Sequence, residues 1–129
     1  MSWIANVERD YLQAAAERRL VLPRCGACGR WHWYPKFRCP HCSAPGWQWA
    51  EAGDSATIFT FTTVSHPFKP PMPVPFVIGI VEPYAAPGVR LVTRIVEVDA
   101  DAVHIGQHVR VDFRPVSPGG PVMPVFRPG

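Results

Sequence analysis

Four cysteines in two closely spaced pairs are the residues of this 129-residue chain whose types and spacing indicate chemistry most clearly. Cys25 and Cys28 form one C-x-x-C pair, and Cys39 and Cys42 form a second pair after ten intervening residues. Two residues between ligands allow both thiolates to reach one metal ion, and Gly29 permits the positive φ that such a tight turn often needs. The pattern predicts one structural zinc ion in a closed tetrahedral site, which would stabilise a segment too short for its own hydrophobic core.

Other uses of the four cysteines are less consistent with the sequence. A redox dithiol also uses C-x-x-C, but two such pairs this close, without a βαβ pattern around them, argue against it. Iron could occupy the same ligand set. His32 and His41 could substitute as ligands, although with four cysteines present we expect them to be exposed polar residues. The N-terminus lacks the pattern of a secretory signal, so we expect a cytoplasmic protein with reduced thiols that act as ligands.

The cysteine pairs lie between a predicted helix and a β-rich half. Trp3 to Leu22 is predicted to be an amphipathic helix, because Trp3, Val7, Tyr11 and Ala15 recur every four residues among charged ones. Pro23 marks its predicted limit. This division predicts an N-terminal helix over 1–24, a zinc ribbon over 25–50 and a further domain over 51–129.

The β-rich half is predicted to hold five short strands. They are expected at Thr57–Val64, Phe76–Val81, Val89–Val98, His108–Arg114 and Val122–Phe126, with a helical turn at Asp101–Gly106. Phe76–Val81 is apolar at every position except Gly79, which predicts a central buried strand with Gly79 at a bulge or close approach. Five strands with a helical insert after the third are typical of an OB-type barrel. The predicted fold class is therefore mainly β, with an N-terminal helix, a zinc ribbon and a five-stranded OB-fold domain.

Several residues outside the cysteine pairs are candidates for binding. His66 and Lys69 lie at the start of a proline-rich loop, His66–Pro75, and His66 could equally be a surface residue that ends a strand. Arg90 and Arg94 are expected on one strand face, where they could meet phosphate groups together with Lys69, Lys36 and Arg38, or simply solvate the sheet. We expect no catalytic residue, because the cysteines are committed to metal and no other activated nucleophile is evident.

The aromatic run Trp31-His32-Trp33-Tyr34, with Trp47 and Trp49, is more than a small ribbon can bury alone. Part of this run could pack the ribbon onto the barrel. Since interfaces favour Trp and Tyr, we expect at least Trp31, Trp33 and Tyr34 to form a partner-binding surface.

The order of these features resembles the rubredoxin-like zinc-ribbon plus OB-fold proteins associated with acyl-CoA metabolism, formerly a domain of unknown function. The resemblance runs from about Tyr11 to Phe113 and is carried by Tyr11–Ala16, Leu20–Leu22, Cys25–Gly29, Cys39–Ser43, Trp49, Phe61-Thr62, Val64, Pro75–Ile78 and Ile105–Val109. It implies a zinc-binding accessory subunit that forms a hetero-oligomer with a thiolase-fold enzyme (a thiolase, acyltransferase or aldolase), holding or channelling the acyl-CoA. The proline-rich loop with His66, Phe68 and Lys69 is then expected to border the acyl-CoA path.

Single-stranded nucleic-acid binding is the alternative function, because zinc ribbons and OB barrels both serve it. Phe59 and Phe61 share one predicted strand face, but we expect both to point into the core. Basic residues do not gather around them, and a net charge of +3 is too small to imply a nucleic-acid partner. No apolar stretch approaches the roughly 20 residues that cross a bilayer, so no membrane partner is expected.

Overall fold

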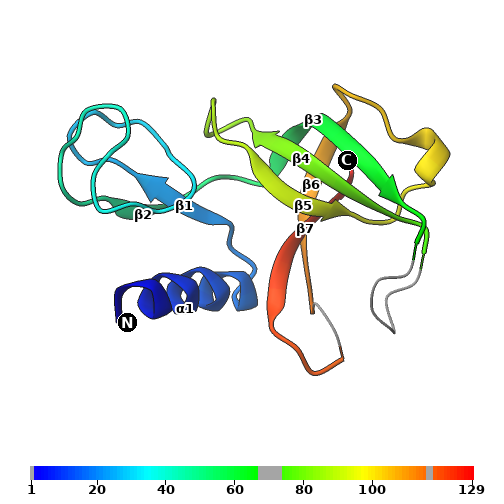
Figure 1. Cartoon of the computed structure of the whole chain (residues 1–129), viewed down its shortest axis with the longest axis horizontal. Coiled ribbons are helices and arrows are strands. Elements are labelled where there is room, and N and C mark those ends of the chain that lie inside the picture. The colour runs from blue at the N-terminus through cyan, green and yellow to red at the C-terminus, as the bar shows by residue number, and fades with distance from the viewer. Residues whose placement is uncertain (1, 67–73, 116–117) are drawn as a thin grey trace.

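The computed structural model describes residues 2–66, 74–115 and 118–129, which form a helix, a ribbon and a barrel (Figure 1). The ribbon side of the molecule contains α1 (Ser2–Ala16), β1 (Val21–Arg24) and β2 (Gln48–Glu51). The barrel contains β3 (Ser55–Val64), β4 (Phe76–Pro83), β5 (Leu91–Ile95), β6 (His108–Pro115) and β7 (Val122–Pro128), with a 3₁₀ turn at Ala100–Ala102. The predicted fold class is confirmed.

The five barrel strands close in the order β3-β4-β5-β7-β6. Neighbouring strands are antiparallel except β5 and β7, which pair in parallel at a single register position, Ile95 with Phe126. This arrangement places strands far apart in sequence side by side and is the OB topology. The barrel core consists of inward-facing residues from all five strands, including Ile58, Val81, Leu91, Val109 and Phe126.

The helix ends earlier than predicted. It stops at Ala16, not Leu22, because Arg18 adopts a left-handed conformation at φ 62° and the N–H of Arg19 donates to the carbonyl of Ala14 at 2.8 Å. A left-handed residue followed by such a backbone hydrogen bond is a common way to cap a helix C-terminus, although glycine more often takes the left-handed position. The following residues form β1, so Pro23 lies in a strand beside Trp49 of β2. The helix itself packs against β1 and β7.

Two predicted strands differ from the observed ones. The strand expected over Val89–Val98 is confined to Leu91–Ile95, since Gly88 and Glu97 at its two ends have positive φ angles of 88° and 56°. The strand at Phe76–Val81 is central, between β3 and β5, but it is buried only on alternate residues. In a five-stranded barrel one face of every strand points outward, so a strand that is apolar on both faces is still buried on only one of them.

Gly79 is a close-approach point, as predicted. A Cβ atom built there would lie 2.9 Å from two side-chain carbons of Ile95, too close for a methyl group. The bulge lies instead in β3, where the register shifts between Ile58 and Thr60. Because a bulge adds one residue to a strand, Phe59 turns outward and is 48% exposed, so the prediction that it faces the core is wrong. Phe61 packs partly buried against the core.

Within the described residues, α1 is too short and too polar to span a bilayer, and the structure contains no other α-helix there.

Candidate metal centre and binding surfaces

The four cysteine sulfurs meet at one end of the ribbon, close enough to bind a single ion. All four Sγ atoms lie within 4.8 Å of one another, with Cys25 and Cys42 3.6 Å apart and Cys28 and Cys39 3.7 Å apart. Four sulfurs at about 2.3 Å from a tetrahedral ion would be about 3.8 Å from each other. The observed distances therefore suit a metal ion bound by four thiolates.

The two cysteine pairs form matching turns. After the first pair, the N–H of Gly29 donates to the carbonyl of Cys25 at 3.0 Å; after the second, the N–H of Ser43 donates to that of Cys39 at 2.9 Å. Gly29 and Ser43 both have positive φ, 74° and 65°. The positive φ predicted at Gly29 is confirmed, and a serine takes the same conformation in the second turn.

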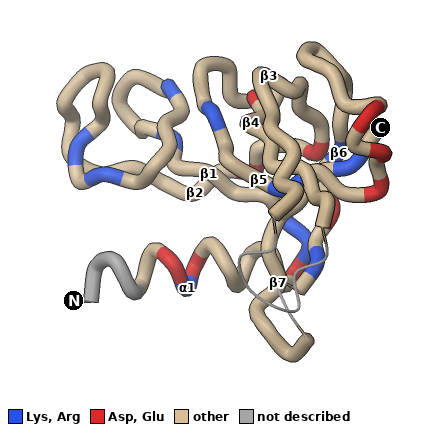
Figure 2. The backbone as a smooth tube through the Cα atoms, turned by 45° about the vertical axis from the view of Figure 1, so that its right-hand side comes forward, with Lys and Arg blue, Asp and Glu red and all other residues tan. Residues whose placement is uncertain are grey.

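An arginine before each pair stabilises the turn that follows it. The Nε–H of Arg24 donates to the carbonyl of Gly29 at 2.8 Å, and Nη1 of Arg38 donates to the carbonyl of Ser43 at 2.9 Å. Sequence reasoning missed this role, although an arginine directly before the first cysteine of each pair was a visible signal. Residues 25–50 contain Arg30, Lys36 and Arg38 and no carboxylate, so the basic side chains partly balance the negative thiolates. Figure 2 shows basic segments in the loops of the ribbon.

The thiol environments also favour a bound cation. The N–H groups of Cys28 and Ala27 point at the sulfur of Cys25 and lower the pKa of that thiol to about 6. The N–H of Ala44 acts in the same direction on Cys42, but burial and the other three sulfurs outweigh it and raise the pKa of Cys42 to about 11. Each thiolate raises the cost of ionising the next, so a bound cation would stabilise the ionised form of the site.

The two histidines near the site have different positions. His41 is exposed, as predicted, with Nε2 3.3 Å from the carbonyl oxygen of Trp31. His32 is only 4% exposed, so the prediction that it is a surface residue is wrong. Its ring lies edge-on to Trp47, and neither ring nitrogen has a hydrogen-bond partner among the described residues. Burial lowers the pKa of His32, and nearby His41 and Lys36 act in the same direction.

The ribbon aromatics pack mainly on the helix and on each other. Trp33 lies against Tyr11 of α1 with ring centroids 5.0 Å apart, and Trp49 lies 6.3 Å from the same ring. Burial between them raises the pKa of Tyr11 to about 12. Trp31 is half-buried beneath the guanidinium of Arg24, whereas Tyr34 is 50% exposed. Of the three predicted partner-binding residues, Tyr34 is therefore the most accessible.

A small apolar cleft lies beside this aromatic cluster. It has a volume of about 310 Å³ and is lined by α1, the ribbon and β7, including Val7, Tyr11, Trp33, Tyr34 and Met123. Three parts of the chain that are distant in sequence meet there.

Arg90 and Arg94 lie on the outer face of the sheet formed by β3, β4 and β5. The guanidinium of Arg90 is 3.7 Å from the ring centre of Phe59, and that of Arg94 is 5.6 Å from the ring centre of Phe76. Arg90 also pairs with Glu82, with its Nε 3.3 Å from the carboxylate. Lys36 and Arg38, the other basic residues considered for phosphate contact, lie in the ribbon.

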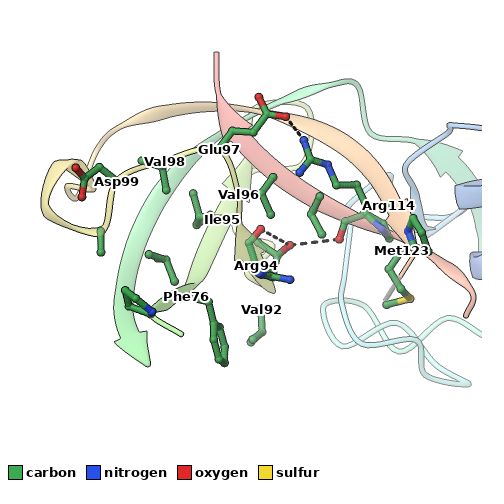
Figure 3. A pocket seen from close by; sticks show the side chains of 17 residues that line it. Phe76, Val92, Arg94, Ile95, Val96, Glu97, Val98, Asp99, Arg114 and Met123 are labelled. Carbon is green, nitrogen blue, oxygen red and sulfur yellow. Dashed lines mark hydrogen bonds and ion pairs between the residues drawn. The ribbon is translucent and has the colours of Figure 1, made fainter. Parts of the chain in front are cut away.

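A groove of about 620 Å³ runs beside Arg94 (Figure 3). It lies where β5 and β7 meet, and these two strands pair at only one position. Its lining includes Phe76, Val92, Arg94, Val98, Arg114 and Met123. Arg114 is paired with Glu97 and Asp112, whereas the buried Nε of Arg94 has no acceptor among the described residues.

The remaining predicted site residues belong to the proline-rich loop. His66 is exposed two residues beyond Val64, whose strand partner is Phe76. Phe68 and Lys69 lie outside the described residues.

Comparison with known proteins agrees with this architecture. The family model described as the ChsH2 rubredoxin-like zinc ribbon domain matches residues 12–48, and the model for the ChsH2 C-terminal OB-fold domain matches residues 49–114. A chain in the solved Ltp2-ChsH2(DUF35) aldolase is 34% identical, with a TM-score of 0.84 over 94% of this chain and 93% of that one. A Sulfolobus solfataricus protein of unknown function from the DUF35 family has the same fold, with a TM-score of 0.65 at 15% identity over 95% of this chain and 85% of that one.

One longer relative comes from Thermomonospora curvata and is named "Probable enoyl-CoA hydratase alpha subunit". It is 36% identical over 125 residues, which are 95% of this chain but 38% of that protein, so the chain spans well under half of its length. The two domain matches together run from residue 12 to residue 114 in the order of the observed ribbon and barrel. The chain belongs to the ChsH2 family of proteins that join a rubredoxin-like zinc ribbon to an OB-fold domain.

Proposed function

We propose that this protein is a non-catalytic accessory subunit, with one structural zinc ion, of an enzyme that acts on acyl-CoA thioesters. The observation that carries the proposal is its similarity, along nearly its whole length, to a chain of the Ltp2-ChsH2(DUF35) aldolase. The relative from Thermomonospora curvata is also named as a subunit, of an enoyl-CoA hydratase. Both similarities support a subunit of an enzyme complex, and the second supports a CoA thioester as the substrate class.

The metal centre supports a structural role for the ion. Four cysteine ligands complete a tetrahedral shell, so the ion has no open position for water or substrate. Since the chain contains only these four cysteines, no thiol remains for nucleophilic catalysis. The catalytic groups therefore come from the partner in this proposal.

A thiolase-fold enzyme is the proposed partner, as the family resemblance implies. The cleft between α1, the ribbon and β7 is the proposed contact, with Tyr34 exposed and Trp33 beside it. Rigid aromatic side chains with accessible edges suit a protein interface. Arg90 and the loop beginning at His66 are proposed to lie near the acyl-CoA, whose phosphates an arginine side chain can bind. Arg94 is assigned to a contact with the partner subunit instead.

Copurification tests this proposal. The chain, tagged at one end and produced in its native host, should recover a second subunit in stoichiometric amount, which mass spectrometry should identify as a thiolase-fold enzyme. The isolated chain should show no thiolase, aldolase or acyltransferase turnover, and the purified subunit should regain full turnover when the chain is added. Turnover by the isolated chain, or recovery of the chain without any second subunit, would contradict the proposal.

Binding to single-stranded DNA provides the test of the alternative function. Phe59 is exposed, as a stacking platform would be, but Arg90 already covers one face of its ring. We therefore expect weak binding of an oligonucleotide at physiological salt. Submicromolar affinity with a steep salt dependence would favour nucleic-acid binding instead.

A further inference from the structure

The outer face of the β3-β4-β5 sheet is more apolar than a solvent-facing sheet surface requires. In β4, Val77, Gly79 and Val81 are buried in the barrel, so Phe76, Ile78 and Ile80 point to the opposite face. Antiparallel sheets with one face in water normally alternate apolar and polar residues. β4 does not alternate, which indicates that its outer face has a use beyond solvation.

The neighbouring strands extend this apolar surface. Val92 of β5 lies directly across from Ile80 and is 72% exposed, the largest exposed fraction among the exposed hydrophobic residues described. Phe59 reaches the same face from the bulge in β3. We call this surface the sheet patch, and its apolar members are Phe59, Phe76, Ile78, Ile80 and Val92.

One arginine lies at each end of the sheet patch. Arg90 lies over Phe59 and Arg94 lies over Phe76, so each guanidinium is held in place by an aromatic ring. Glu82 neutralises Arg90 in part, but the buried Nε of Arg94 has no acceptor among the described residues. Among the described residues of the patch, two arginines therefore face one carboxylate, and an unsatisfied donor lies at the Phe76 end, where the groove of about 620 Å³ begins. Glu97, which is paired with Arg114, and Asp99 line the same groove.

We propose that the sheet patch is a docking surface for the partner subunit, which contributes an apolar ridge over Val92 and Ile80 and a carboxylate to Arg94. The inference rests on the proposed function and adds a second contact to the one at the ribbon. A carboxylate would pair with the guanidinium of Arg94 by a charge-assisted hydrogen bond. The adjacent groove has room for a side chain from the same partner segment.

Charge distinguishes this occupant from a second copy of the chain. Two copies that met through the sheet patch would bring arginines against arginines, and Glu82 is the one carboxylate that pairs with either arginine among the described residues. Like charges brought together at an interface disfavour association. The surface therefore fits an acidic, apolar partner better than it fits itself.

The test compares Val92→Lys with Ile105→Lys in the copurified complex and with the purified subunit. Ile105 is a control of similar exposure, 66%, and lies in the loop before β6. That loop is bonded to β3 at Ile58, on the side of β3 away from β4, so β3 and β4 separate it from Val92. Val92→Lys should weaken subunit binding by about tenfold or more, as expected for a charge buried at an interface centre, while Ile105→Lys should bind as the wild type does. Arg94→Gln should weaken binding and also reduce its dependence on salt.

Each outcome decides between the two proposals. If the wild-type chain and the Val92→Lys variant bind the subunit equally well, the sheet patch is not the docking surface, although the accessory function stands. If the wild-type chain recovers no subunit, the accessory function and the docking surface fail together. A dimer of the isolated chain that Val92→Lys dissociates in sedimentation experiments would overturn the proposal in favour of a second copy. Unchanged thermal melting and zinc content establish that each variant is folded.

Discussion

Gly29 and Ser43 occupy equivalent positions in the two cysteine turns, and exchanging their residue types tests the backbone argument for the metal centre. Both have positive φ, and both donate an N–H to the carbonyl of the first cysteine of their pair. The first turn has the residue that tolerates this conformation, and the second does not. Gly29→Ser should therefore destabilise the ribbon, and Ser43→Gly should stabilise it.

The structure allows the size of the effect to be worked out. A Cβ atom at Gly29 would lie 3.9 Å from Nη2 of Arg24, an ordinary contact, so steric overlap adds no cost. The left-handed conformation costs an L-residue about 1–2 kcal/mol, and removing a glycine recovers about 0.4–1 kcal/mol from the unfolded chain. The net change is about 1 kcal/mol in opposite directions for the two variants. Because metal binding and ribbon folding are coupled, this corresponds to about a fivefold change in apparent zinc affinity.

Competition with a chromophoric zinc chelator at neutral pH measures this change. Gly29→Ser should release zinc at a lower chelator concentration than the wild type, Ser43→Gly at a higher one, and the double variant close to the wild type. Ser43→Ala serves as the control, since alanine keeps the strain of a side chain in the left-handed region. If Ser43→Gly binds zinc more weakly than the wild type does, the hydroxyl of Ser43 rather than its backbone conformation is what matters, and the reasoning is refuted.

Three further predictions follow from the metal centre, the buried histidine and the barrel. Purified protein should contain about one zinc per chain by elemental analysis. The Cys39→Ser variant should lose the ion and its ribbon should unfold, because three thiolates leave the tetrahedral shell incomplete. An intact ribbon without metal would contradict this prediction. The folded state holds the pKa of His32 below its ordinary value of 6.5, so the unfolded chain binds the proton first and stability falls as the pH drops through 6.5. His32→Phe should show a smaller loss of melting temperature on mild acidification than the wild type, and an equal loss would exclude His32 as the source. Gly79→Ala should lower the free energy of unfolding by about 1–3 kcal/mol, because the added methyl group would overlap Ile95. A double variant with Ile95→Ala should cost less than the sum of the two single changes, as chemical denaturation can measure, and simple additivity would argue against the contact.

The ribbon shows what local sequence can determine. Cys25, Cys28, Cys39 and Cys42 are brought together by two short turns whose geometry depends on neighbouring residues alone, so their spacing was enough to predict that the four sulfurs would meet. Ser43 was not predicted to be left-handed, because serine has no preference for that region, and only the match between the two turns reveals it.

The barrel shows what pairing between distant strands decided. The order of β-rich segments and turns was enough to predict five strands and an OB fold. The direction of Phe59 was not predictable, because the bulge that turns it outward arises where β3 and β4 fail to stay in register. The burial of His32 likewise depends on residues brought near it by the folded ribbon, such as Trp47.

The sequence by itself determined which cysteines come together and which segments form the barrel strands, since spacing and hydrophobic periodicity are local properties of the chain. Only the tertiary structure decided which faces remain open. Phe76, Ile78, Ile80 and Val92 have the composition of core residues, yet a closed barrel of five strands has room inside for one face of each strand. The other face is left for solvent or for a partner.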